Sequence, residues 1–358
     1  MNTKPIQNLW LATQDTKLRT LVRAALTSQG LTPLDLKPEN LFPTAAGRAG
    51  VAPEAGSVLL LDLAPEAIAP HLAAEAIHQV RSLPWRPRVL ALAATERTVW
   101  ANEAAWAKGL TGHALLPRPA NSVAAFLGIL LNELELGAVD LRRLDTHLRV
   151  MLNAGEDKAP EALIRRLTGG SAQDLAAALL AGGNVADRRY HLKKYPECMV
   201  GKDAVGWLSK RYGVSRADAV QLGDALYRSA YLHHVVKEQP FADEEFFYRV
   251  ATPGRFDTIP LDAVAAFLRG AKGLIADRAW RGINFPQCMV GSEAVDAIAA
   301  HFRLTRAEAT VLGQSLVDFG LLRHVADEHP FADANLYYEL PSGVPAEPPV
   351  MVAAGVRA

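Results

Sequence analysis

The sequence has little of what usually marks a catalytic, secreted or membrane-spanning chain. It contains two cysteines in 358 residues, and its 38 Lys and Arg residues equal its 38 Asp and Glu residues. Because a non-specific nucleic-acid binder normally carries a basic excess, the balanced charge argues against that class. No apolar stretch approaches the ~20 residues of a membrane span. A hydrophobic content of 50 % is nevertheless ample for folded cores.

Motifs for enzyme chemistry are also missing. The histidines are scattered, and the sequence shows no nucleophile motif, no glycine-rich phosphate loop and no metal-ligand spacing. We therefore predict a protein that is not an enzyme, with no catalytic residues, no metal and no cofactor. The N-terminus lacks the apolar segment of a signal peptide, which predicts a cytoplasmic protein. In that reducing compartment Cys198 and Cys288 are expected to be small buried side chains rather than a disulfide.

The sequence contains an internal repeat of two copies. Residues Asp187–Tyr248 and Asp277–Tyr338 align at a constant offset of 90 positions without a gap, and 24 of the 62 aligned residues are identical. The identities cluster in ordered motifs, among them Pro-x-Cys-Met-Val-Gly, Leu-Gly, His-Val and Pro-Phe-Ala-Asp. A period of 90 is too long for a solenoid repeat, so each copy is predicted to be a domain with its own core.

Local signals predict the same elements in both copies. Capping boxes, or sequences close to one, at Ser215–Asp218 and Thr305–Glu308 open a helix with apolar residues at helical spacing. A glycine on that apolar stripe, Gly223 or Gly313, suggests a close helix–helix approach. Two β-type runs around a proline-containing loop then predict a hairpin. Each copy is therefore expected to be three helices followed by a hairpin, which is a winged-helix arrangement.

These ordered motifs resemble the DEP domain, a module named in part for Dishevelled and pleckstrin. The resemblance covers residues 171–251, called here the first repeat, and 259–341, the second repeat. It implies two α+β winged-helix domains without enzymatic activity. It also implies a signalling adaptor that binds partner proteins or an anionic membrane surface.

The first third of the chain alternates strands with helices. Strands are predicted at Asn8–Ala12, Leu31–Leu36, Ser57–Asp62, Arg88–Ala93 and His113–Leu116, with helices after most of them. This alternation favours a doubly wound parallel α/β sheet, whose ligands sit at the carboxyl ends of the strands. We call residues 1–137 the N-terminal module.

Five βα units with an aspartate ending the third strand resemble the response-regulator receiver domain, a flavodoxin-like fold. Asp62 falls at the phosphoacceptor position of that family, and Arg118 falls where a lysine is expected. The acidic pair that would hold Mg²⁺ is replaced by Thr13 and Gln14, with Asp15 alone one place further on. Phosphoryl transfer to a carboxylate needs a divalent cation, so we predict a pseudo-receiver that is not switched by phosphorylation. Ala93 at the usual Ser/Thr position supports this, and Asp62 can instead pair with Arg118.

Residues 138–170 are predicted to be a helical linker, and residues 342–358 a disordered tail. Leu141, Leu144, Leu148 and Met151 recur in this linker at spacings of 3, 4 and 3. The stripe is compatible with a dimerising coil and hence a homodimer, or with a helix that packs on its own domain.

Two functions remain after these exclusions. The first is a cytoplasmic signalling adaptor that uses a degenerate receiver and tandem DEP modules to bind signalling proteins. In one version of this hypothesis the adaptor also associates peripherally with a membrane. The alternative is a winged-helix DNA-binding response regulator controlled by the receiver-like domain. Acidic residues in the recognition-type helices and wings argue against it, because phosphate contacts require Lys and Arg. No nucleic-acid partner is therefore expected.

The two repeats differ in charge. Asp187–Arg216 has eight Lys or Arg and three Asp or Glu, net +5, whereas the aligned Asp277–Arg306 has four and three, net +1. The excess is either a solvated face or a surface for anionic lipids or an acidic partner. Its main residues, called here the basic patch, are Arg188, Arg189, Lys193, Lys194 and Lys202.

Overall fold

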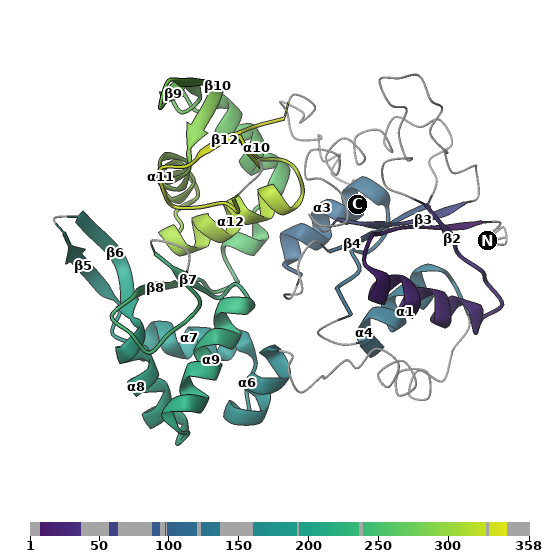
Figure 1. Cartoon of the computed structure of the whole chain (residues 1–358), viewed down its shortest axis with the longest axis horizontal. Helices are drawn as coiled ribbons and strands as arrows, with labels where there is room; N and C mark the ends of the chain where they lie inside the picture. Colours follow the sequence, from purple (N-terminus) through teal and green to yellow (C-terminus); the bar gives the residue numbers. More distant parts are fainter. Residues whose placement is uncertain are drawn as a thin grey trace, which may run out of the picture.

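The computed structural model describes residues 8–36, 57–63, 88–93, 97, 99–119, 123–136, 160–191, 193–235, 239–326 and 329–341. Within them the chain forms an N-terminal α/β module beside two helical modules, each of which carries a four-stranded sheet (Figure 1). The predicted strand Leu31–Leu36 is present only as a two-residue strand, and the stripe Leu141–Met151 and the tail lie outside the described residues.

The N-terminal module is built on a parallel sheet of strands β1 (Leu9–Ala12), β2 (Leu34–Asp35), β3 (Val58–Asp62) and β4 (Arg88–Leu92), in the order β2-β1-β3-β4. The predicted fifth strand is reduced to a parallel bridge between Leu92 and Leu116. Its helices are α1 (Thr16–Thr27), α3 (Ala101–Thr111) and α4 (Val123–Glu133). The parallel sheet predicted from alternating strands and helices is therefore present.

Both faces of this sheet are buried, as expected when helices cover a parallel sheet on two sides. Alternate residues such as Leu60 and Leu90 join α1 and α4 in one apolar cluster. Their neighbours Leu61 and Ala91 point to the other face and join the cluster that contains Trp100 and Ala107. Figure 1 shows α1 and α4 on one side of the sheet and α3 on the other.

The first repeat begins with helix α7 (Ala172–Gly182). Strands β5 (Ala186–Tyr190) and β6 (Lys193–Val200) follow, then helices α8 (Gly201–Tyr212) and α9 (Arg216–Arg228), and last strands β7 (Leu232–His234) and β8 (Phe247–Val250). The sheet order is β5-β6-β8-β7. The predicted cap is confirmed, since Ser215 accepts a hydrogen bond from the Asp218 amide, and so is the β7–β8 hairpin.

The second repeat copies this plan. A short 3₁₀ turn, η3 (Phe256–Thr258), precedes it, and its helices are α10 (Leu261–Gly270), α11 (Gly291–Phe302) and α12 (Arg306–Asp318). Its strands are β9 (Ala276–Trp280), β10 (Ile283–Val290), β11 (Arg323–His324) and β12 (Tyr337–Glu339), in the order β11-β12-β10-β9.

Two features of the repeats differ from the sequence expectation. Each repeat has an additional hairpin between its first and second helices, β5–β6 or β9–β10; these are called here the arm hairpins. The glycine on the apolar stripe of α9 does not serve a helix–helix approach. A Cβ at Gly223 would overlap the ring of Phe241, and Gly313 stands in the same relation to Phe331. The Leu-Gly and Pro-Phe motifs are thus two halves of one packing contact.

The expected linker is also partly incorporated into the first repeat. Helix α6 (Pro160–Thr168) packs on α9 and α7 and buries Leu163 and Ile164. Each repeat buries its own set of apolar residues, but these sets are not separate. One continuous apolar cluster runs from the N-terminal sheet through Trp100 to Tyr231 of the first repeat and to Phe256, just before the second.

Candidate functional site

The expected phosphoacceptor is a buried and fully engaged carboxylate. Asp62 ends β3 and is 1 % exposed. Arg118 Nη2 donates to Asp62 Oδ1 over 2.5 Å, and Thr13 Oγ1 donates to Asp62 Oδ2 over 2.5 Å. Because each carboxylate oxygen has a donor and a guanidinium neutralises the charge, the site already satisfies Asp62 without any bound ion.

The surrounding residues do not fit a Mg²⁺ site. Thr13 is itself buried, and its hydroxyl is committed to Asp62. Asp15 caps α1 by accepting hydrogen bonds from the amides of Lys17 and Leu18, and its carboxylate lies 3.7 Å from Arg118 Nη1. Mg²⁺ requires several oxygen ligands in near-octahedral geometry. Besides Asp62 itself, these side chains supply only the carboxylate of Asp15, and Arg118 already lies beside it. Asp62, Arg118 and Asp15 are therefore brought together, but as an ion-pair cluster.

The basic patch is spread over both faces of the first arm hairpin and the first turn of α8. Arg188 turns inward, donates to the carbonyl oxygens of Asn184 and Cys198, and lies 3.8 Å from Asp203. Arg189, on the other face, is exposed and stands directly opposite Lys194 across the hairpin.

The two lysines of the patch whose side chains are described have acidic neighbours. Lys194 Nζ lies 2.8 Å from Asp187, and Lys202 Nζ lies 3.5 Å from Glu245. Such exposed pairs are weak and screened by salt, so the lysines remain available to another anion. Lys193 lies in β6, and its side chain is outside the described residues. The structure thus keeps Arg189, Lys194 and Lys202 exposed, whereas Arg188 is half-buried and engaged.

A further set of polar and apolar contacts lies where α3 of the N-terminal module meets both repeats. Trp100, which precedes α3, packs edge-on against Tyr231 at 5.2 Å and against Phe256 at 5.3 Å between ring centroids. Trp106, two turns along, contacts Phe319 at 4.7 Å. We call this contact region the α3 junction; it places one helix against residues more than a hundred positions away in the sequence.

A buried ion cluster lies within the α3 junction. Arg97 donates to both oxygens of Glu103 over 2.9 and 2.5 Å, and to Asp318 over 3.2 Å. Ser315 of α12 donates to Glu103 over 2.6 Å. The side chains of Arg97 and Asp318 are each 6 % exposed. A guanidinium shared between two carboxylates fixes α3 and α12 in one geometry, because each group would be costly to bury alone.

The cluster holds one positive and two negative charges away from water. Burial raises the pKa of Asp318 to about 6, and Glu103 adds to the rise while Arg97 opposes it. Two further hydrogen bonds complete the contact: Asn102 donates to the carbonyl oxygens of Phe256 and Ile259 over 3.2 and 3.1 Å. The N-terminal module is therefore joined to the repeats by polar groups whose partners come from both sides.

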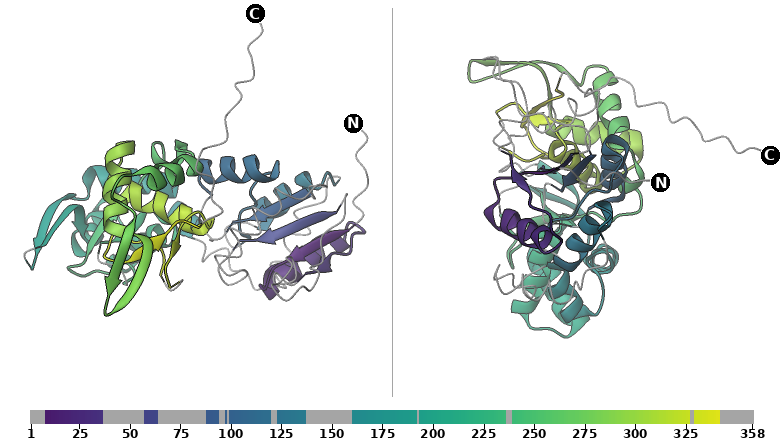
Figure 2. Two further views of the ribbon diagram at one scale, coloured as in Figure 1. Left: turned by 90° about the horizontal axis from the view of Figure 1, so that it is seen from above. Right: turned by 90° about the vertical axis from the view of Figure 1, so that its right-hand side faces the viewer.

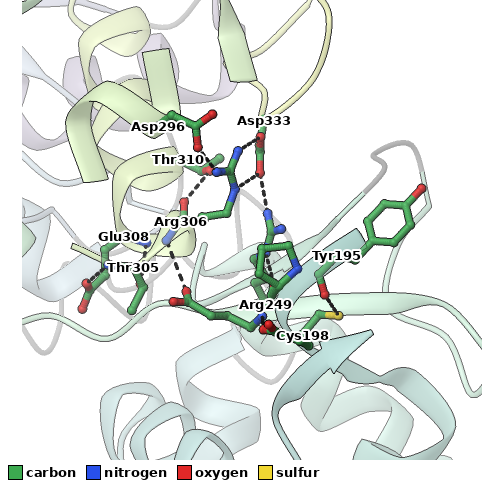
Figure 3. Close-up of polar contacts among 12 residues, drawn as sticks. Tyr195, Cys198, Arg249, Asp296, Thr305, Arg306, Glu308, Thr310 and Asp333 are labelled. Atoms are coloured by element: carbon green, nitrogen blue, oxygen red, sulfur yellow. Dashed lines mark hydrogen bonds and ion pairs between the residues drawn. The ribbon is translucent and has the colours of Figure 1, made fainter. Parts of the chain in front are cut away.

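The two repeats also contact each other directly (Figure 3). Arg249 of β8 donates to Asp333 of the second repeat over 2.5 Å, and Asp333 accepts two more hydrogen bonds from Arg306. Arg249 is held in turn by the carbonyl oxygen of Pro196. Although burial opposes it, hydrogen bonds from Arg306 and the charge of Arg249 lower the pKa of Asp333. Asp333 is therefore an ionised carboxylate shared by two arginines from two modules.

Of the two helices that would enter a DNA groove in a winged-helix reader, α12 is covered and α9 is covered in part. None of the residues of α12 is exposed. Helix α9 lies against α8 on one side and α6 on another, although Arg216 and Arg228 stay at the surface.

Sequence reasoning missed the α3 junction. Two tryptophans six residues apart on an otherwise alanine-rich helix were the available signal, since a helix that exposes them requires a partner. Among the described residues no cluster of His, Cys, Asp and Glu could hold a metal ion. No described helix is long and apolar enough to cross a bilayer.

Comparison with known families identifies the two repeats. The model of the DEP family, described as the domain found in Dishevelled, Egl-10 and Pleckstrin, matches residues 182–250 and 274–340. The chain therefore carries DEP sequence in two segments, as the repeated motifs predicted.

Curated relatives share this part of the chain. The chain is 28 % identical over 166 residues to the mouse phosphatidylinositol 3,4,5-trisphosphate-dependent Rac exchanger 1 protein, a match that covers 43 % of this chain and 10 % of that protein. The vacuolar membrane-associated protein IML1 of Saccharomyces cerevisiae is 27 % identical over 122 residues, covering 32 % of this chain and 8 % of IML1. The chain thus spans about a tenth of the length of these relatives.

Proposed function

We propose that this chain is a non-enzymatic signalling adaptor in which a receiver-like N-terminal module holds two DEP modules in one fixed arrangement. The observation that carries the proposal is the α3 junction. Helix α3 and the residues just before it bury Trp100, partly bury Trp106 and hold a three-residue ion cluster against the repeats. An arrangement held by so much buried contact is suited to presenting a composite surface to a partner.

The Asp62 site supports a structural role for the receiver-like module. The strand order β2-β1-β3-β4, with Leu116 beyond β4, is compatible with the flavodoxin-like order. In that fold the phosphoacceptor must be reachable by a donor and a metal, whereas Asp62 is held by Thr13 and Arg118. We infer that this module acts as a docking element without a phosphorylation switch.

The proposed partners are signalling proteins and, through the first repeat, an anionic membrane surface. The names of the relatives support the second partner, since one is phosphoinositide-dependent and another is vacuolar membrane-associated. The exposed Arg189, Lys194 and Lys202 supply the matching charge. Such a protein would work in the cytoplasm and associate peripherally with a membrane.

The test is affinity capture from a native extract with the intact chain and with an Arg97→Met variant. We expect a discrete protein partner that binds the intact chain and binds the variant more weakly, because the variant loosens the composite surface. Arg228→Met, at an exposed surface pair, is the matched control. The proposal fails if incubation with a small phosphodonor and Mg²⁺ gives a stoichiometric adduct on Asp62. It also fails if selection from random duplexes enriches a DNA motif.

A further inference from the structure

The second arm hairpin ends in large apolar side chains that the fold does not use. Trp280 is 50 % exposed and Ile283 is 56 % exposed, and they face each other across the strand pair β9–β10. Figure 2 shows this hairpin projecting from the body of the second repeat. A tryptophan and an isoleucine at the end of a two-stranded ribbon have no core beneath them, so their exposure requires an explanation other than folding.

The turn between them is a tight one that fixes their positions. Arg281 and Gly282 both have positive φ angles, 49° and 81°, which is the pattern of a two-residue type I′ turn. The guanidinium of Arg281 lies over the Trp280 ring at 4.4 Å from its centroid. The tip therefore presents an indole, a branched aliphatic side chain and a cation together.

The tip carries no negative charge. From Ala279 to Phe285 the sequence has one cation and no acidic residue. Two acidic groups near the base of the hairpin are already engaged: Asp277 accepts a hydrogen bond from the Gln287 amide over 3.0 Å, and Glu293 pairs with Arg278 at 2.6 Å. An apolar tip with a single cation matches the interfacial zone of a bilayer, where tryptophan rings lie at the headgroups and arginine reaches lipid phosphates.

We propose that the tip of the β9–β10 hairpin, formed by Trp280, Arg281 and Ile283, inserts into the interfacial region of an anionic membrane. The exposed apolar area favours this occupant over a protein. Half-exposed side chains of this size offer on the order of 200 Å² together, far below the ~800 Å² per partner of a stable protein interface. A convex tip of this area is instead suited to shallow, reversible entry into a bilayer.

The first arm hairpin provides a matched comparison. Its Tyr190 aligns with Trp280 and is also exposed, at 59 %. However, its ring packs edge-on against His191 at 4.1 Å and lies 6.4 Å from Phe247 of β8, between ring centroids. At the position aligned with Ile283, the first repeat has Lys193. The first repeat is thus suited to attraction by charge, and the second to insertion. The inference rests on membrane association as proposed above, but assigns it a second and different contact.

The experiment is flotation of the full-length chain with vesicles of phosphatidylcholine containing about one third phosphatidylserine. Trp280→Ser with Ile283→Ser should lower the bound fraction about tenfold, because the apolar area that enters the bilayer is lost. Tyr190→Ser should bind like the unaltered chain. In vesicles with brominated lipid tails, tryptophan emission should be quenched in the unaltered chain and not in Trp280→Phe. All variants alter exposed residues, so circular dichroism should confirm unchanged folding.

Salt separates this contact from the basic patch. Exposed charges are screened over ~10 Å at 0.1 M salt and ~3 Å at 1 M. Binding through the tip should therefore persist in part at about 1 M salt, and its loss there would overturn the inference. So would equal binding by the double serine variant, quenching that survives Trp280→Phe, or no binding to any vesicle. If binding is instead lost with Arg189→Glu and Lys194→Glu alone, the proposed function stands and the tip has no role.

Discussion

Replacing Arg97 by methionine should release the N-terminal module from the second repeat. The change keeps most of the side-chain volume but leaves Glu103 and Asp318 buried with no guanidinium between them. Removing one partner of a buried ion pair costs about 3–5 kcal/mol, because the remaining charge stays uncompensated. Since each 1.4 kcal/mol is a factor of ten, docking should weaken roughly 100- to 3,000-fold.

Amide hydrogen exchange of the full chain measures this directly. Protection should fall in α3 and α12, whose contacts depend on Arg97, while β3 should stay protected because its partners lie within the N-terminal module. Arg228→Met is the control, since its pair with Asp224 is exposed and worth no more than about 0.5 kcal/mol. Lowering the pH to about 5 should restore part of the protection by neutralising Asp318. Unchanged exchange in α3 and α12 would refute the assignment of the α3 junction to this cluster.

Three further outcomes are expected. Because burial raises the pKa of Asp318 to about 6, above its ordinary 3.8, the folded state takes up a proton as the pH falls from 7 to 5. Over that range the free energy of unfolding of the unaltered chain should rise by about 1 kcal/mol relative to Asp318→Asn, as measured by thermal melts. Parallel pH profiles of the two proteins would contradict this. Reversing Arg189 and Lys194 to glutamate should reduce the salt-sensitive part of binding to anionic vesicles, and an unchanged salt profile would make the patch a solvated face. Gly223→Ala should lower the free energy of unfolding by about 1–3 kcal/mol, because its Cβ would overlap Phe241; a denaturant titration with no shift would disprove that contact.

Local sequence signals were sufficient for most elements of the fold. The capping box at Thr305–Glu308 predicted the start of α12. The structure contains this capping box, in which Glu308 accepts a hydrogen bond from the Thr305 amide over 2.8 Å. The buried strand ending at Asp62 and the repeated motifs predicted the parallel sheet and the paired modules. These signals are readable because caps, turns and apolar runs involve residues close in sequence.

The arm hairpins were missed because they lack the usual strand pattern. Residues 186–190 of β5 are mainly exposed and include Arg188 and Arg189, so neither face reads as apolar. Pairing is instead set by the backbone ladder with β6, which itself pairs with β8. A strand without an apolar face has no period-two hydrophobic signal.

The α3 junction was missed for a different reason. Its contacts join residues 221 positions apart, as between Arg97 and Asp318. No periodicity reports such a pairing, because the helix pattern of α3 is the same whether its tryptophans meet a neighbouring domain or their own sheet. The pairing of Asp62 with Arg118, by contrast, was predicted from the sequence and is confirmed.

The contact between the repeats has a consequence for assembly. The two repeats are joined head to tail: Arg249 on β8 of the first repeat binds Asp333, which lies between β11 and β12 of the second. Any unit joined in this way has two unlike faces, and a chain of such units has no geometric reason to stop. In the first repeat, the residue aligned with Asp333 is Asp243, which pairs with Arg216 at the surface.

The donor face of the second repeat carries the opposite charge. The residue aligned with Arg249 is Glu339, which is held by Arg323 over 2.5 Å. Glu339 brought to Asp243 would place two carboxylates together, which is repulsive at close range. The charge reversal at Glu339 therefore disfavours the addition of a third unit through the same contact.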